Sequence, residues 1–353
     1  MSIKHITLSL SLLSTFTLYA DINVQDEHSY LDNLHSSISD DVHTLSHSID
    51  KLFSGSVDDQ NTTLVNRSPY DTTKSVDSFF QTNKFLNETE KTFLRVNFNS
   101  LFQTKHSSDF KYKIRARIPL SRTKKNYNLF IEDIQENGSN QVLKDESINQ
   151  SSSTAIGVNY FAAKTYGIKS KYSIGTSGFN PFVRARYNLN YSLQDWFIEP
   201  VQTFKYSSNR KFEEETNVYF DKVIKDAELL RLTLYRHTQE NVKGMDYAFS
   251  AQYFLPLKSQ TAISISQVFV GNTKYLDIPY GSPTTQSYNT YGGINDYITT
   301  VNYRENIWKK WFFYELSPGV NFHRQHDYKV NYSMRFSIDI YFGQTYKKLC
   351  PPN

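Results

Sequence analysis

Cysteine and long apolar runs are nearly absent from this chain. Its 353 residues include one cysteine, Cys350, so an intramolecular disulfide and a zinc site built from several thiolates are both excluded. Beyond the N-terminus no run of about 18 uncharged apolar residues occurs, which excludes a protein that crosses a membrane with helices. The net charge of +4 is too small to indicate a nucleic-acid partner.

Aromatic residues, by contrast, are abundant. The chain has 26 Tyr and 25 Phe, and its aromatic fraction is 15%, although its mean hydropathy is only −0.55. A transmembrane β-barrel combines these properties, because only alternate residues of each strand face lipid and aromatic girdles mark both membrane interfaces. An aromatic-rich soluble β-sandwich is the alternative.

Residues 110–118 show the pattern that supports the barrel most directly. In Phe-Lys-Tyr-Lys-Ile-Arg-Ala-Arg-Ile every even-numbered residue is apolar and every odd-numbered residue is a cation. Successive side chains of a strand point to opposite faces, so this segment forms a ribbon with one apolar and one basic side. Similar alternation recurs throughout 91–343, which we interpret as an all-β, antiparallel transmembrane barrel in a bacterial outer membrane.

The remaining parts of the chain differ from this pattern. Residues 1–20 are expected to be a signal peptide, with Lys4 in its charged start, an apolar run from Ile6 to Leu18, and cleavage after Ala20. Residues 21–90 are expected to be a periplasmic region that either lies outside the barrel or plugs its mouth. Residues 344–353 are expected to be a C-terminal tail.

Within 21–90, apolar residues first recur at spacings of three and four. This stripe predicts an amphipathic helix over about 29–53 and is formed by Leu31, Leu34, Ile38, Val42, Leu45, Ile49 and Leu52. The other face carries His35, His43 and His47. His43 and His47 have an i, i+4 spacing that can hold a metal, but a solvated polar face is the preferred interpretation and no metal or cofactor is expected. Residues 54–90 are polar and are expected to be a linker.

The barrel region predicts about fourteen strands, and a barrel of twelve is the alternative. The expected strands span 92–102, 109–120, 126–135, 153–163, 166–175, 181–192, 195–206, 211–221, 227–237, 245–256, 260–270, 296–304, 310–322 and 328–343. The two longest connections, 136–152 and 271–295, both follow odd-numbered strands and therefore fall at the same end of the barrel. Short periplasmic turns and long extracellular loops are typical of this class.

Alternation also separates the lumenal side chains from the lipid-facing ones. A charge on the lipid face at the midplane costs about 2–4 kcal/mol, so the charged rows are expected to face the lumen. The lumenal cations are expected to be Arg95, Lys111, Lys113, Arg115, Arg117, Arg184, Arg186 and Arg335. Their expected counter-charges are Glu132, Glu199, Glu213, Glu215, Glu315 and Asp339.

Two segments carry a resemblance to a known family. Residues 110–120, Phe-Lys-Tyr-Lys-Ile-Arg-Ala-Arg-Ile-Pro-Leu, look like its first β-hairpin, and residues 311–320, Trp-Phe-Phe-Tyr-Glu-Leu-Ser-Pro-Gly-Val, look like its closing hairpin. The chain thereby resembles a family of proteobacterial outer-membrane β-barrel proteins whose function is not established. Residues 338–342 resemble the C-terminal strand signal of outer-membrane proteins, although eleven residues follow Phe342 instead of none. The resemblance implies fold and location but no substrate.

The function favoured by these observations is a passive, porin-like channel with a basic lumen. The extracellular loop carries Tyr275, Tyr280, Tyr288 and Tyr291 and is a candidate constriction, with an ordinary surface loop as the alternative. A non-conducting structural or assembly protein, whose N-terminal helix binds a periplasmic partner, is the second hypothesis. The other expected partners are outer-membrane lipids and the barrel-assembly machinery.

An outer-membrane hydrolase is the third and weakest hypothesis. The segment Gly175-Thr176-Ser177-Gly178 has a serine but no neighbouring histidine, so it lacks the Ser–His pair of a barrel phospholipase. His237, and His323 with His326 and Asp327, lie in or beside expected loops and are interpreted as solvated. Since no nucleophile, base and orienting group can be named together, no catalytic residue is assigned and the chain is not expected to be an enzyme.

Overall fold

A computed structural model of the chain describes residues 32–42, 44, 69–80, 82, 84, 93–105, 107–120, 126–135, 152–225, 228–240, 242–258, 260–276, 290–307 and 311–342. The chain divides into two units, residues 1–41 and 42–353. Residues 32–42 and 44 are helical, which covers part of the helix expected over 29–53. No helix in the described part of the chain is long and apolar enough to cross a membrane.

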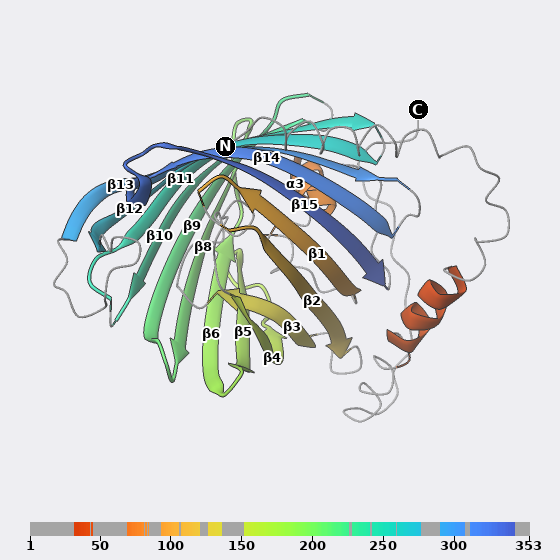
Figure 1. Ribbon diagram of the computed structural model, residues 1–353. Coiled ribbons are helices and arrows are strands. Elements are labelled where there is room, and N and C mark those ends of the chain that lie inside the picture. The colour runs from red at the N-terminus through yellow and green to blue at the C-terminus, as the bar shows by residue number, and fades with distance from the viewer. Residues whose placement is uncertain are drawn as a thin grey trace, which may run out of the picture. The chain divides into compact units, whose positions relative to one another are not determined.

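The second unit is built around one antiparallel sheet (Figure 1). Its strands are β1 (Phe93–Gln103), β2 (Asp109–Leu120), β3 (Tyr127–Gln135), β4 (Ser152–Phe161), β5 (Ile168–Ser177), β6 (Asn180–Leu189), β7 (Tyr191–Leu193), β8 (Trp196–Ser207), β9 (Lys211–Val223), β10 (Leu229–Gln239), β11 (Asp246–Lys258), β12 (Thr261–Leu276), β13 (Thr290–Asn306), β14 (Phe312–His323) and β15 (Val330–Phe342). A helix, α3 (Pro69–Phe80), precedes them, and a 3-10 turn, η1 (Arg324–His326), joins β14 to β15.

Two pairings, β1 with β15 and β6 with β8, close the sheet into a barrel. The first and last strands pair antiparallel, with Phe98 opposite Ile338. β6 pairs with β8, with Ala185 opposite Phe204, and the short β7 continues β6 along the same neighbour. Because β6 and β7 together occupy one strand position, the sheet's 15 strands form a closed barrel of fourteen, as the sequence predicts.

Most strand bounds agree with the expected ones to within one or two residues. The exception is the long loop expected over 271–295, because β12 runs on to Leu276 and β13 begins at Thr290. The register shifts beside Gly271 and again between Asn272 and Tyr275, and Gly293 adopts a φ of +125°. These irregularities let the two strands continue past Gly271 and Gly293 into the segment expected to be a loop.

The two faces of the barrel are inverted relative to a soluble protein. On β2, Phe110 and Tyr112 are 65% and 70% exposed, whereas Arg117, on the opposite face of the strand, is 2% exposed. The same holds on β10, where Leu234 is exposed while Arg231 and Thr233 are buried. An apolar, aromatic exterior around a polar interior suits a barrel surrounded by lipid, where closure also leaves no unpaired strand edge. The fold is that of a bacterial outer-membrane β-barrel.

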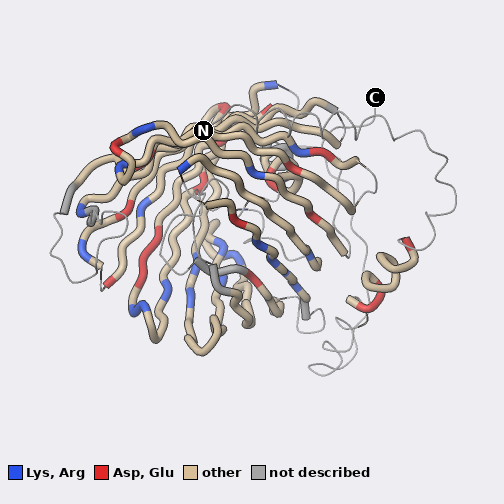
Figure 2. The backbone as a smooth tube through the Cα atoms, viewed as in Figure 1, with Lys and Arg blue, Asp and Glu red and all other residues tan. Residues whose placement is uncertain are grey.

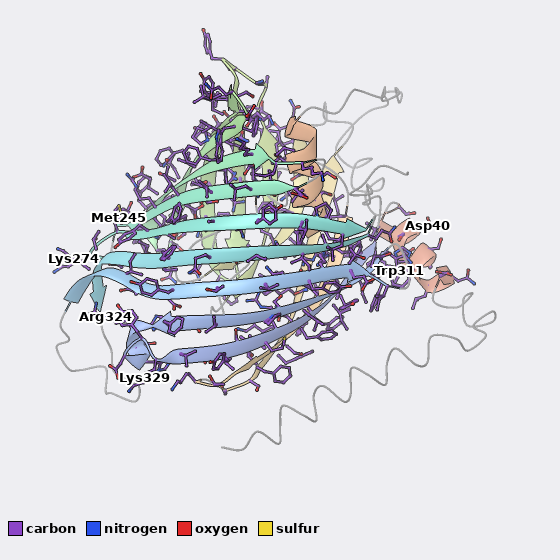
Figure 3. All side chains as sticks on the ribbon, turned by 90° about the horizontal axis from the view of Figure 1, so that it is seen from above. Asp40, Met245, Lys274, Trp311, Arg324 and Lys329 are labelled. Carbon is purple, nitrogen blue, oxygen red and sulfur yellow. The ribbon has the colours of Figure 1, made fainter. Side chains whose placement is uncertain are left out.

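The barrel has two rims, which we name by what they carry. The loop rim carries the connections 136–151 and 277–289, and the terminal rim is where Phe93 begins β1 and Phe342 ends β15. Figure 3 shows Met245, Lys274, Arg324 and Lys329 at the loop rim and Trp311 at the opposite rim. The connections at the terminal rim are short, as the sequence predicts.

Helix α3 packs against the inner wall near the terminal rim. Pro69 begins the helix, a position where its missing N–H costs nothing, and the Thr82 N–H donates to the Asp77 carbonyl at 3.0 Å just beyond its end. Its buried Val76 and Phe79 form one apolar cluster with Leu229, Phe254, Ala262, Phe313 and Tyr341. Those partners come from five strands on the inner face, so the helix occupies the lumen at this rim.

Gly157 makes a first test of the wall packing. A Cβ at this position would lie 2.2 Å from the Ile174 carbonyl oxygen on β5 and 2.7 Å from the buried Phe130 ring. Because backbone cannot move aside as a flexible side chain can, Gly157→Ala is expected to lower the free energy of unfolding by about 1–3 kcal/mol. Urea unfolding of the refolded protein in detergent measures this loss. Thr154→Ala, on the outer face of the same strand, is the control, and equal midpoints for both variants would refute the packing argument.

Candidate functional site in the barrel lumen

Charge is unevenly distributed over the inner wall (Figure 2). On the inner face of β2 to β6 the cations are Lys111, Lys113, Arg115, Arg117, Lys169, Lys171, Arg184 and Arg186, which we call the basic wall. Among the described inner side chains of these strands, the carboxylates are Asp109 and Glu132. The inner faces of β8 and β9 instead carry the acidic row Glu199, Glu213, Glu215 and Asp221. Both groups arise because every second side chain of a strand faces inward, and the charged residues of these strands occupy those alternate positions.

Glu132 connects three strands of the basic wall. Its carboxylate accepts a hydrogen bond from Arg184 on β6 at 2.8 Å and lies 3.7 Å from the Arg117 guanidinium on β2. Arg184 also donates to Ser173 at 3.3 Å, and Ser173 donates to Asn159 at 2.6 Å. The structure thus brings together two of the expected lumenal cations and one of the expected counter-charges.

Asp339 forms a second junction, at the seam between the first and last strands. Arg95 on β1 donates to it through Nε at 2.8 Å and through a terminal nitrogen at 3.0 Å. Arg304 on β13 donates at 2.6 Å to Oδ2, which also accepts from the terminal nitrogen of Arg95, and Asn97 donates to Oδ1 at 2.8 Å. Asp339 and Arg304 are each 1% exposed. Arg304 also reaches Glu315 at 3.2 Å, so this network contains three residues expected from the sequence.

A third network joins α3 to the wall, and we call it the helix anchor. Arg231 on β10 donates to both carboxylate oxygens of Asp77, at 2.6 and 3.0 Å, and to both of Asp221, at 2.6 and 2.8 Å. Lys84, just after the helix, lies 2.8 Å from Glu199 and 3.2 Å from Asp221. All five side chains are at least nine-tenths buried, so each charge depends on the others for compensation.

Lys84 is charged in this setting. Burial lowers the pKa of its ammonium, but Asp221, Glu199 and Asp77 outweigh that effect and raise the pKa above its usual value. Its Nζ also lies 4.9 Å from the centre of the Tyr219 ring. The apolar cluster around Val76 and Phe79 continues to Trp311 at the terminal rim. The helix is therefore held by both ion pairs and apolar contacts.

The remaining expected site residues have varied partners. Lys111 lies 2.6 Å from Asp109, and Glu213 lies within 3.2 Å of Lys205 and Arg210. Glu215 accepts a hydrogen bond from Asn217, and Glu199 accepts one from Asn188. Alternation places Lys113, Arg115, Arg186 and Arg335 on inner faces of β2, β6 and β15.

Two of the four tyrosines of the expected constriction loop lie in strands, and the other two lie outside the described residues. Tyr275 and Tyr291 lie opposite each other on β12 and β13, so they belong to the extended hairpin, not to a loop. Tyr280 and Tyr288 lie outside the described residues. A constriction formed by this segment stays a prediction.

Several members of the networks were not expected from the sequence. Arg231 and Arg304 follow the same alternation as the expected cations and could have been found by it, since Arg231 is flanked by Leu230 and Leu232 on β10. Asp77 and Lys84 fall in the segment 54–90 that was read as a linker. There the signal was Pro69 followed by Val76, Phe79 and Phe80 at helical spacing.

The candidate hydrolase residues do not form a catalytic set in the described part of the chain. His237 is buried on β10, with Nδ1 3.3 Å from Asp246 and Nε2 3.6 Å from Glu213. His323 accepts a hydrogen bond from the Gln325 N–H at the start of η1, and its ring centre lies 6.4 Å from that of His326. In the described part of the chain, the hydrogen-bond partner of the His237 ring is Asp246, and that of the His323 ring is the Gln325 backbone, neither of which is a nucleophile.

No protein-family model and no curated protein matches the chain. Solved structures similar to it include a loop-deletion mutant of OmpT, an outer membrane protein of Vibrio cholerae, at 8% identity and a TM-score of 0.42, covering 71% of this chain and 98% of that one. KdgM porin in complex with disordered oligogalacturonate gives 10% identity and 0.33, covering 70% and 98%. Pseudomonas aeruginosa OccK5 gives 7% and 0.40, covering 71% and 97%. Values this low carry no conclusion about function.

Proposed function

We propose that this protein is a porin-like outer-membrane channel with a basic lumen, kept closed by α3. The observation that carries the proposal is the basic wall, since rows of inward cations on β2 to β6 favour anionic solutes in a barrel lumen. A barrel of fourteen strands is intermediate in width between eight-strand barrels, whose lumen is packed with side chains, and water-filled barrels of 16 or more strands. In a lumen of this width a helix can decide whether the channel is open. The proposal assigns no enzymatic activity.

The orientation follows from the connections. Short turns and both ends of the barrel lie at the terminal rim, which supports a periplasmic position for that rim and an extracellular one for the loop rim. Helix α3 then lies in the periplasmic mouth of the barrel. The barrel-assembly machinery and outer-membrane lipids are the partners that this location implies.

Single-channel conductance in planar bilayers tests the proposal. The intact refolded protein is expected to conduct weakly or not at all, whereas a version lacking residues 21–90 is expected to give steady ohmic current with a reversal potential that favours anions. Circular dichroism and heat-dependent gel mobility show that each barrel is folded before it is measured. A folded barrel that stays silent without residues 21–90 contradicts the channel function.

The second candidate is a non-conducting structural or assembly protein. The buried networks around Glu132, Asp339 and Arg231 favour it, because a lumen crossed by ion pairs is a rigid one. On this hypothesis the helix expected over 29–53 binds a periplasmic partner through its apolar stripe. Deleting residues 21–90 then removes the partner without creating a current, which separates the two candidates.

A further inference from the structure

The outer wall of the barrel is hollowed along β3 to β9 (Figure 1). A shallow groove of about 520 Å³ lies there, on the face that alternation turns toward lipid. Its floor is aliphatic and is formed by Ile174 on β5 together with Val183 and Ala185 on β6. Ile174 and Val183 are 63% and 51% exposed, so the described part of the chain leaves this floor uncovered.

Aromatic rings border the floor on both sides. On one side Tyr160 of β4 and Tyr172 of β5 stack with their ring centres 6.3 Å apart. On the other side Phe204 of β8 and Phe212 of β9 stack with their ring centres 6.1 Å apart. Ala185 is directly opposite Tyr172 on one neighbouring strand and directly opposite Phe204 on the other. The groove therefore passes between two aromatic rows over a methyl group.

Two glycines lie on the inner face behind this floor. Gly157 on β4 is directly opposite Gly175 on β5. A Cβ at Gly157 would lie 2.7 Å from the Phe130 ring, and a Cβ at Gly175 would lie 3.0 Å from the Phe182 ring. Glycines inside strands mark tight bends of a barrel wall. We attribute the hollow on the outer face to a bend of the wall toward the lumen at these two positions.

The lining of the groove suits an apolar occupant. Its outer-face side chains are aliphatic or aromatic, and the side chains of Ser173, Arg184 and Lys205, which also border it, bond to inner-wall partners. Lipid tails are as apolar as these side chains, so the hydrophobic effect does not favour one position of a tail over another. An unfilled groove does, because its atoms lose dispersion contacts that a chain lying in it restores on several sides at once.

We propose that this groove is a binding site for one acyl chain of an outer-membrane lipid. The groove is continuous with the lipid-facing surface of the barrel, so lipid reaches it without passing through the lumen. Its volume of about 520 Å³ is in the range of sites that hold a single small ligand. The inference goes beyond the proposed function, since it concerns the outer wall and holds whether or not the lumen conducts.

Native mass spectrometry of the full-length refolded protein tests the site. The barrel is sprayed from detergent micelles that contain dimyristoyl phosphatidylethanolamine, and the lipids still bound after the detergent is removed are counted. One retained lipid per barrel is expected. Ala185→Phe fills the floor between the two aromatic rows, so it is expected to reduce lipid retention roughly tenfold through the loss of chain contacts.

Ala251→Phe is the matched control. Ala251 is on the outer face of β11, and it is not among the residues that line the groove. The same enlargement there is expected to leave lipid retention unchanged. Val183→Phe fills the floor beside Ala185 and is expected to lose the lipid as Ala185→Phe does, which keeps the test valid if one of the two folds poorly. Heat-dependent gel mobility shows that each barrel is folded.

The single-chain lipid myristoyl lysophosphatidylethanolamine tests whether one chain is enough. The unaltered protein is expected to retain it, and retention of the two-chain lipid alone would overturn the single-chain site. Equal retention of lipid by Ala185→Phe and the unaltered protein, or bound detergent in place of lipid, also overturns the proposal. A lipid-free dimer that Ala185→Phe dissociates would instead assign the groove to a second copy of the chain.

Discussion

Replacing Arg231 with methionine is expected to lower the free energy of unfolding by about 3–5 kcal/mol, the usual loss when one partner of a buried ion pair is removed. The guanidinium contacts four carboxylate oxygens, two on Asp77 and two on Asp221, at 2.6 to 3.0 Å. Both carboxylates are buried, and Lys84 is the cation left to compensate them. Urea unfolding in detergent measures the loss.

The same substitution has a predicted effect on current. Asp77 belongs to the segment of α3, whereas Arg231 and Asp221 belong to the wall, so loss of Arg231 weakens the attachment of the helix as well as the barrel. We expect Arg231→Met to conduct in bilayers under conditions where the unaltered protein is expected to be nearly silent. A folded Arg231→Met barrel as silent as the unaltered protein would show that the anchor does not hold the helix in place.

Arg236→Met is the matched control. It makes the same change on the same strand, but Arg236 is on the outer face, its side chain is 42% exposed, and its partner Glu214 lies at 2.7 Å. Exposed ion pairs contribute about 0–1 kcal/mol, so the control is expected to unfold close to the unaltered protein. Similar losses for both variants would mean that burial does not govern the cost at Arg231.

The barrel was predictable from the sequence because its chemistry repeats with period two. Each strand of the barrel has to place apolar residues toward lipid and polar ones inward, so the segment from Phe110 to Ile118 identifies β2 without any knowledge of its neighbours. The extension of β12 to Leu276 was not predictable by the same means. It depends on pairing with β13 across irregular register, which is a property of two strands together.

The charges of the lumen were predictable as a class, whereas their pairing was not. Alternation assigns Glu132 and Arg184 to the inner face, but their contact joins β3 to β6 across two intervening strands. Sequence separation gives no measure of such a distance. Helix α3 was missed for another reason: its polar residues resemble a linker, and the apolar partners that stabilise it lie more than a hundred residues later in the chain.

Asp339 is expected to be the most sensitive carboxylate of the wall. Asp339→Asn leaves Arg95 and Arg304 without their shared counter-charge at 2.8 and 2.6 Å, and the loss in unfolding free energy is expected to be about 3–5 kcal/mol. Asparagine has nearly the same shape, so the change removes charge without creating a cavity. Glu315, at 3.2 Å from Arg304, remains as partial compensation for that guanidinium only.

The position of Asp339 at the seam determines how this loss should appear in kinetics. β1 and β15 lie at opposite ends of the barrel sequence, so their pairing closes the largest loop and is expected late in folding. Interactions absent from the transition state act on unfolding, so Asp339→Asn should unfold faster while refolding at a similar rate. Asp327→Asn, a substitution of a carboxylate whose side chain is 83% exposed beside η1, should change neither rate. If Asp339→Asn instead slows refolding, the seam forms early and the barrel closes before its wall is complete.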